Sequence, residues 1–220
     1  MIFSYFAFLK INKIPKKNWS SDRPLNFKPK ISTIIYLFIG LFFISFGEGL
    51  LIISSSGNSP WRVLSEGVSE STNLSTGVAD LIISLVVLLI WFFLKQKPGI
   101  GTLMNLIIVA LVIDLTSIMF ITPSSIYWQY ILGIVSILLI GLGTSIYLIA
   151  NLGPGPRDGL MTGFMSVTKL PVFVIRTTIE IIVVITGWKL GGTLGISTVI
   201  FALLIGPVIS LSLYLIHKFY

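Results

Sequence analysis

Residues 31–54 read ISTIIYLFIGLFFISFGEGLLIIS, a run in which Glu48 is the single charged residue. A stretch of about 20 apolar residues is long enough to cross the hydrocarbon core of a bilayer as a helix. The composition agrees, since 55% of the 220 residues are hydrophobic, 10% are charged and the mean hydropathy is +0.99. Charged residues make up about 25% of an ordinary soluble domain, so a soluble globule is excluded.

The same criterion predicts six membrane-spanning helices, at residues 31–54, 74–94, 99–121, 126–151, 170–188 and 190–216. Seven of the 15 lysines and arginines precede residue 31, where Asp22 is the single acid. Because basic residues are retained on the cytoplasmic side, we expect a basic cytoplasmic tail over 1–30 and, after six crossings, a cytoplasmic C-terminus. The chain is therefore expected to be a multi-pass protein of the inner (plasma) membrane.

The tail begins with an apolar run, residues 2–9, which precedes its lysines. A secretory signal peptide has the opposite order, with positive charge before the apolar run, so a cleavable signal is excluded. Two interpretations stay open: the first residues lie in the membrane interface, or the tail is disordered.

A Gly/Pro-rich segment occurs twice at an offset of 96 residues: 57–64 read GNSPWRVL, and 153–160 read GPGPRDGL. The same offset aligns several other glycines, and both residue types mark special backbone conformations. The chain thus divides into two repeats, 31–121 and 126–217, within one membrane domain. Each repeat has three spans, an odd number, so the second inserts with the opposite orientation, as in many secondary transporters. The alternative is that a duplication built a stable helix bundle with no transport function.

A short helix follows each Gly/Pro turn, predicted at 60–71 and 156–168. Proline is favoured at a first helical position because that residue needs no N–H donor. Both helices are too short and polar to span, so they re-enter the membrane, where protein or water satisfies their ends, or lie flat in the interface. We favour re-entrant helices. The predicted gating residues of the turns are Gly57, Pro60, Gly153, Gly155, Pro156 and Asp158.

The second repeat carries a resemblance to a known family. Its motifs are LGPGPRDGL at 152–160, Arg176 with Glu180, GGT at 191–193 and ALLIGP at 202–207. These resemble the bacterial YczE-like integral membrane proteins, relatives of the YitT group. In the first repeat the turn with Pro60 and Trp61, the KPGIGT loop at 97–102, Asn105 and Asp114 are similar to motifs of that family. Arg62 departs from the pattern, because it stands where analogy with Asp158 would place an acid. The resemblance implies a multi-pass inner-membrane protein of a family with no established biochemical activity.

Five ionisable residues fall within the predicted spans: Glu48, Asp80, Asp114, Arg176 and Glu180. An unpaired charge at the bilayer centre costs about 2.5 to 3.5 kcal/mol on insertion scales, so these side chains are expected to be protonated, paired or facing water. Counted along their spans at about 1.5 Å per residue, Glu48, Asp80 and Asp114 fall at one depth toward the outer face. We predict that these residues bind an ion or substrate, together with Arg176 and Glu180.

Alternatives stay open for each of these residues. Carboxylates at one depth can hold a cation or share a proton, but each acid can also simply bond to a neighbouring helix. Arg176 and Glu180 are four residues apart on one helix face, so they pair locally or leave Arg176 for an anion or for Asp80.

Several functional classes are excluded by composition. The chain has no cysteine and one histidine, His217, so it has no disulfide, thiolate zinc site, cysteine nucleophile or histidine metal cluster. No HExxH or GxSxG motif occurs, so no enzyme activity, cofactor or metal is expected. The net charge of +7 is explained by the orientation of the tail, so no nucleic acid is expected either.

Two functions stay open. The first is a small secondary transporter or facilitator of an unknown solute or ion, in which Glu48, Asp80 and Asp114 bind a coupling proton or cation. The second is a non-transporting scaffold or regulator, whose short helices and basic tail bind a protein or lipid partner. Both place the protein in the lipid bilayer, and both leave an oligomer open.

Overall fold

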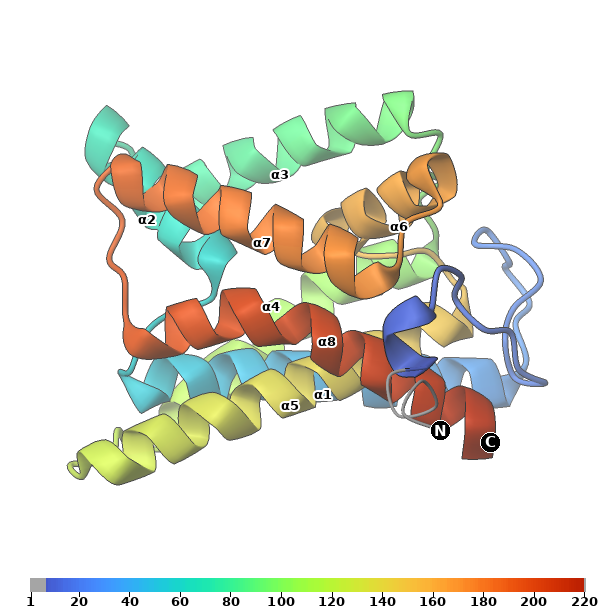
Figure 1. Ribbon diagram of the computed structural model, residues 1–220, viewed down its shortest axis with the longest axis horizontal. Coiled ribbons are helices and arrows are strands. Elements are labelled where there is room, and N and C mark those ends of the chain that lie inside the picture. The colour runs from blue at the N-terminus through green and yellow to red at the C-terminus, as the bar shows by residue number, and fades with distance from the viewer. Residues whose placement is uncertain (1–6, 220) are drawn as a thin grey trace.

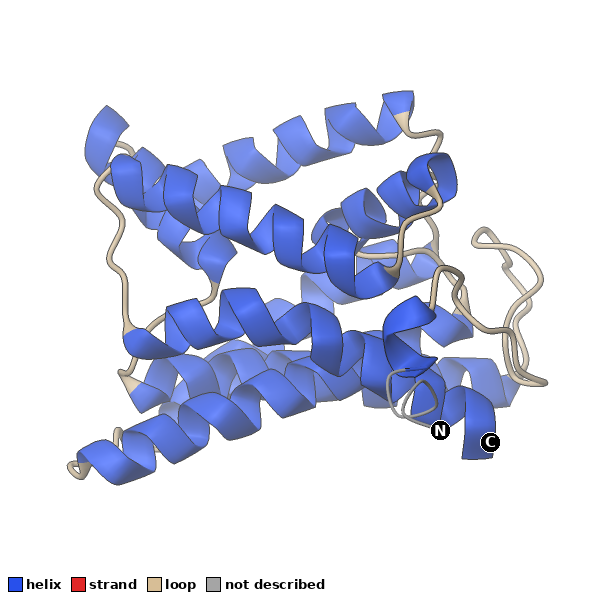
Figure 2. Cartoon of the chain, viewed as in Figure 1, coloured by secondary structure: helices blue, strands red, loops and turns tan. Residues whose placement is uncertain are grey.

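The computed structural model describes residues 7–219 (Figures 1 and 2). All regular secondary structure in these residues is helical, and they contain no strand. The elements are a 3-10 turn η2 (Ala7–Lys10) and the helices α1 (Ile31–Ser54), α2 (Pro60–Thr72), α3 (Thr76–Phe93), α4 (Ile100–Met119), α5 (Ile126–Ala150), α6 (Pro156–Thr168), α7 (Val172–Lys189) and α8 (Ile196–Phe219). Residues 2–6 of the apolar N-terminal run lie outside the described part of the chain.

Five helices, α1, α3, α4, α5 and α8, are long and apolar enough to cross a membrane, against six predicted. The difference is α7, whose 18 residues include Arg176, Glu180 and Lys189. Arg176 and Glu180 are 5% and 0% exposed, so α7 directs these charges into the protein. Apolarity alone therefore does not identify α7 as a span.

The helix boundaries repeat at the offset of 96 residues. Helices α2 and α6 start at Pro60 and Pro156, α3 and α7 at Thr76 and Val172, and α4 and α8 at Ile100 and Ile196. The residues that end α1 and α5, Ser55 and Asn151, are both left-handed, with φ of 52° and 56°. Gly57 and Gly153 follow with φ of 141° and 101°, a region that favours glycine. The backbone of the two Gly/Pro turns therefore requires the glycines that the sequence repeats.

Helices α1 and α5 form the centre of the bundle. A Cβ atom on Gly40 would lie 2.6 Å from the backbone nitrogen of Tyr147, and one on Gly143 would lie 2.7 Å from that of Ile44. Small residues thus let the two helix backbones approach closely. Helix α4 packs against α1, and α8 packs against α5.

Helices α3 and α7, which correspond at the offset of 96, pack against different kinds of neighbour. Helix α7 packs against both α8 and α2, whereas α3 packs against α2 and α6 and lies apart from α4, its neighbour in sequence (Figure 1). The short helices α2 and α6 lie at opposite ends of the molecule, α6 at the end where both termini lie. The separation of α3 from α4 leaves room for the pocket described below.

The N-terminal segment from residue 7 onward packs against the end of the bundle. Trp19 is 6% exposed, and its carbonyl accepts a hydrogen bond of 2.6 Å from the Thr33 hydroxyl. The backbone of Ser21 donates to Ala150, and that of Val172 donates to Ile11. Trp19 also stacks on Tyr36 of α1, with ring centroids 4.2 Å apart. The sequence predicted an interfacial or disordered tail and did not reveal this packing, because the partners lie on distant helices.

Candidate functional site

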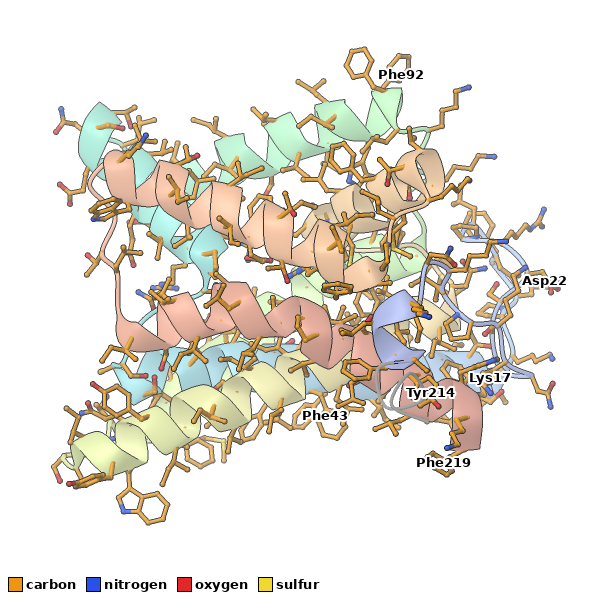
Figure 3. All side chains as sticks on the ribbon, viewed as in Figure 1. Lys17, Asp22, Phe43, Phe92, Tyr214 and Phe219 are labelled. Atoms are coloured by element: carbon orange, nitrogen blue, oxygen red, sulfur yellow. The ribbon has the colours of Figure 1, made fainter. Side chains whose placement is uncertain are left out.

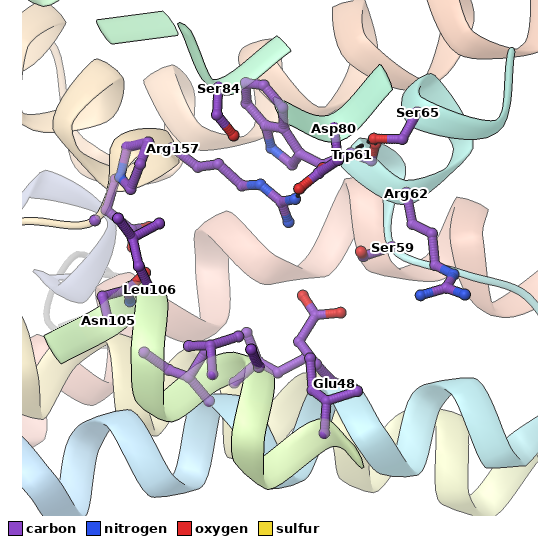
Figure 4. Close-up of a pocket in the computed structure, with 18 of the residues that line it drawn as sticks. Glu48, Ser59, Trp61, Arg62, Ser65, Asp80, Ser84, Asn105, Leu106 and Arg157 are labelled. Carbon is purple, nitrogen blue, oxygen red and sulfur yellow. Dashed lines mark hydrogen bonds and ion pairs between the residues drawn. The ribbon is translucent and has the colours of Figure 1, made fainter. Parts of the chain in front are cut away.

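A pocket of about 470 Å³ lies inside the helix bundle (Figure 4). Helices α1, α2, α3, α4 and α6 supply most of its lining. Its polar side chains are Glu48, Ser59, Arg62, Ser65, Thr76, Asp80, Ser84, Asn105, Thr144, Arg157, Asp158 and Arg176. Apolar side chains such as Ile44, Ile113 and Phe201 complete the wall, so the cavity combines convergent charges with an apolar frame, as ligand sites do.

The start of α6 brings two charged residues to this pocket. Pro156 occupies the first helical turn, which places Arg157 and Asp158 at the inner end of the helix. A carboxylate in the first turn is stabilised by the helix dipole. The other side of α6 is fixed by Trp91 of α3, whose indole donates to the carbonyl of Pro156 at 2.9 Å and lies against Gly159 with no space for a Cβ atom.

Arg176 of α7 is the centre of a buried network. Its guanidinium contacts Asp158 at 2.6 Å and Glu180 at 2.9 Å. The indole of Trp61 donates to Glu180 at 3.2 Å, and the hydroxyl of Tyr147 donates to Asp158. Arg176 and Glu180 therefore pair locally, and the further partner of Arg176 is Asp158 rather than Asp80.

Arg157 of α6 lies across the pocket from its own helix, against α2 and α3. Its guanidinium is 3.0 Å from a carboxylate oxygen of Asp80, which also accepts a hydrogen bond of 2.9 Å from Ser65. It lies 5.4 Å from the ring centroid of Trp61, within cation–π range. The side chains of Arg157 and Asp80 are 34% and 46% exposed, so this ion pair is accessible from the pocket.

Glu48 points from α1 into the same cavity, toward Ser59 and Arg157 (Figure 4). Among the described residues it has no cation within salt-bridge distance, in contrast to the other acids of the pocket. The cavity and its immediate partners hold the carboxylates of Glu48, Glu66, Asp80, Asp158 and Glu180 against the guanidinium groups of Arg62, Arg157 and Arg176. Carboxylates are thus in excess.

The predicted group of three acids is only partly brought together. Glu48 and Asp80 line the pocket, but Asp114 is exposed and does not. Ile113 does line it, and one further residue turns the helix by about 100°, which places Asp114 on the exposed surface with Leu111. Equal depth along the spans did not fix the direction in which each side chain points. Within the described residues, no three acids or histidines are grouped to hold a metal ion.

The predicted gating residues lie at two turns, each of which packs against the start of a distant helix. The turn with Gly153, Gly155, Pro156 and Asp158 contacts the start of α4, where the amide of Gly101 donates to Leu152 at 2.7 Å. The turn with Gly57 and Pro60 contacts the start of α8, where the amide of Ser197 donates to Ser56 at 3.1 Å. The two contacts correspond at the offset of 96, because residues 101 and 152 map onto 197 and 56.

A second pocket, of about 300 Å³, lies on the other side of the 153–158 turn. Tyr147 lines this second pocket, and its hydroxyl also accepts a hydrogen bond of 3.1 Å from the amide of Gly155. Asp158, its acceptor, lines the first pocket. The turn and Tyr147 therefore separate the two cavities.

Sequence reasoning missed Trp61, Trp91, Tyr147 and Arg157 as parts of this site. Arg157 and Asp158 adjoin the repeated Gly/Pro turn, and that position was the available signal. Trp61 carries the same signal, because the offset of 96 aligns it with Arg157. Nothing local marks Trp91 and Tyr147, because their partners are 65 and 11 residues away in the chain.

Comparison with known proteins identifies relatives along most of the chain. Residues 31–213 match the model of a family of unknown function (DUF6198). An uncharacterised protein of Haemophilus influenzae is 38% identical over 95% of this chain and 95% of its own length. The uncharacterised membrane protein YczE of Bacillus subtilis is 31% identical over 81% of this chain and 84% of its own length. No solved structure matches.

Proposed function

The chain belongs to the family of unknown function DUF6198 and is a YczE-like membrane protein, and we propose that it is a small secondary transporter or facilitator that binds a proton or cation. The observation that carries this proposal is Glu48, a carboxylate that points into the cavity and, among the described residues, has no cation within salt-bridge distance. A carboxylate without such a partner is costly inside the protein unless a proton or a cation neutralises it.

We propose that the two halves form an inverted repeat, with α7 as the sixth span. Two observations support this arrangement: the start of each half's last helix holds the Gly/Pro turn of the other half, and α2 and α6 lie at opposite ends. The charges of Arg176 and Glu180 do not face lipid, because Arg176 forms ion pairs with Asp158 and Glu180 inside the protein. With six crossings, the lysine-rich tail and the C-terminus lie together in the cytoplasm.

Asp80 and Arg157 supply the exchangeable part of the site. A cation that enters the pocket competes with the Arg157 guanidinium for Asp80 and for the face of Trp61. Because this pair is half-exposed, it exchanges more easily than the buried pair of Arg176 and Asp158. Glu48 then carries the proton, or the second contact to the cation.

The two turns act as gates with reversed charges. We propose that the bridge from Tyr147 through Asp158 to Arg176, which lies between the two cavities, is one gate in its closed state. The offset of 96 maps Asp158 and Arg176 onto Arg62 and Asp80, the same kind of pair with its signs exchanged. In the alternate state, Arg62 pairs with Asp80, and Arg157 is released.

The test uses proteoliposomes that contain a trapped pH-sensitive dye. Exchange of internal protons for external Na⁺, K⁺ or a small organic ammonium ion reports flux without knowledge of the natural solute. We expect Glu48→Gln and Asp80→Asn to lower the exchange rate at least tenfold, because each removes a pocket carboxylate. Asp114→Asn is the matched control, since Asp114 is exposed and does not line the cavity.

A second readout needs no flux. A hydrophobic carbodiimide labels protonated carboxyl groups in membranes, and mass spectrometry should find Glu48 labelled, with protection by a bound cation. Exchange that is unchanged in Glu48→Gln, or absent from the wild type with every ion, contradicts the transport proposal and leaves the scaffold alternative.

A further inference from the structure

The second pocket is basic as well as separate. It lies at the end of the bundle that carries both termini, and Lys16, Lys95 and Lys97 line it. None of its lining residues is acidic. Lys16 comes from the N-terminal segment, whereas the other two come from the loop between α3 and α4, so the chain brings them together from distant positions.

Within the described part of the chain, the side chains of these lysines have no protein partner. Among the described residues, none of the three ammonium groups makes a hydrogen bond or an ion pair, whereas the ammonium group of Lys17 donates to His217 and that of Lys30 to Asn18. Like charges around one cavity repel each other, and an anion between them removes that repulsion. The arrangement is therefore suited to an anion.

The surroundings of the pocket indicate which kind of anion. Helix α3 is a candidate span, and its last residues, Phe92 and Phe93, are 82% and 80% exposed. Phe92 points away from the bundle at this end of α3 (Figure 3). Lys95 follows two residues later, so acyl chains along α3 would bring a lipid headgroup to the basic pocket. Basic pockets at this position between membrane helices bind anionic headgroups.

We propose that this pocket is a binding site for a phosphate group, carried by an anionic phospholipid or by free phosphate. The three ammonium groups donate charge-assisted hydrogen bonds to the phosphate oxygens. The bound phosphate ties the N-terminal segment to the α3–α4 loop. Since Tyr147, Gly153 and Pro154 also line the pocket, occupancy holds the turn that separates the two cavities.

The experiment compares the melting temperature of the full-length protein in lipid nanodiscs. One arm replaces phosphatidylcholine by phosphatidylglycerol, and a second arm adds sodium phosphate to phosphatidylcholine nanodiscs against sodium chloride at equal ionic strength. The variant is Lys16→Gln, Lys95→Gln and Lys97→Gln together. The control is Lys10→Gln, Lys13→Gln and Lys28→Gln, which removes the same charge from exposed lysines outside the pocket.

We expect phosphatidylglycerol to raise the melting temperature of the wild type and the control, and the pocket variant to lose at least half of this shift. A shift with phosphatidylglycerol alone identifies the lipid, and a shift with sodium phosphate as well identifies the free anion as a ligand. If the triple variant does not fold, the single variant Lys97→Gln takes its place. The phosphatidylglycerol that the wild type retains in native mass spectrometry is then the second measurement. The proposal is overturned if the melting temperatures of the pocket variant and the control shift equally. It is also overturned if the melting temperature of the wild type shifts in neither arm.

Discussion

Replacing Tyr147 by Phe removes one hydroxyl from the wall between the two cavities and leaves the packing of a side chain that is 1% exposed. That hydroxyl donates to the carboxylate of Asp158 and accepts from the amide of Gly155 at 3.1 Å. A hydrogen bond to a charged group contributes about 1.5 to 3 kcal/mol. If the bond exists only while the wall is closed, its loss shifts the closed-to-open ratio by about 10- to 150-fold, at about 1.4 kcal/mol per tenfold.

Because the chain has no cysteine, a single Ser84→Cys reports access to the first pocket. We expect Tyr147→Phe to raise the rate at which a membrane-impermeant thiol reagent labels this cysteine from the side of the termini, by about tenfold or more. Tyr214→Phe is the control, since among the described residues its hydroxyl makes no hydrogen bond. Equal labelling rates in Tyr147→Phe, Tyr214→Phe and the parent would refute the reasoning that this hydroxyl holds the wall closed.

Two further predictions concern the arrangement of the halves. Asn73 and Lys169 end α2 and α6 at positions 96 residues apart, and both are exposed and left-handed. In an inverted repeat, single cysteines at these two positions should be labelled from opposite sides of the membrane. Labelling of both from the same side excludes the inverted repeat. For the alternate gate, Arg62→Asp and Asp80→Arg should each lower the rate of proton exchange in proteoliposomes about tenfold or more. The double variant should recover part of the lost exchange rate, because the pair forms with either polarity. A double variant as inactive as the single variants contradicts the Arg62–Asp80 pair.

Most of the helices could be predicted from the sequence. The predicted short helices at 60–71 and 156–168 match α2 and α6 to within one residue, because proline and glycine determine backbone geometry locally. Length and apolarity likewise located the five helices that can span. Hydropathy was less decisive for α7, since it cannot distinguish a charge that faces lipid from one that is paired inside the protein.

The site was predicted less completely, because its geometry depends on rotation about helix axes and on contacts between distant elements. Asp114 has the same predicted depth as Glu48 and Asp80, but its side chain is exposed and does not line the pocket. The contact of Arg157 with Asp80 joins residues 77 positions apart, and no periodicity within one helix indicates it. The depth of a side chain follows from counting residues along one span. The direction in which it points follows only from the packing of several spans.

In the proposed gating mechanism, the exchanged charges of Arg62 and Asp80 give the two gates the same kind of ion pair with opposite polarity. Two equivalent gates would each need an ion pair between an aspartate and an arginine. In the second repeat, Asp158 and Arg176 form that pair. Reversing the signs keeps that pairing and also gives Asp80 a second partner, Arg157, which it contacts at 3.0 Å in this structure. In this proposal Asp80 neutralises Arg157 while the gate at the 153–158 turn is closed, as in this structure, and neutralises Arg62 in the alternate state. One carboxylate with two competing guanidinium groups is a two-state element, and a cation that displaces Arg157 shifts its balance.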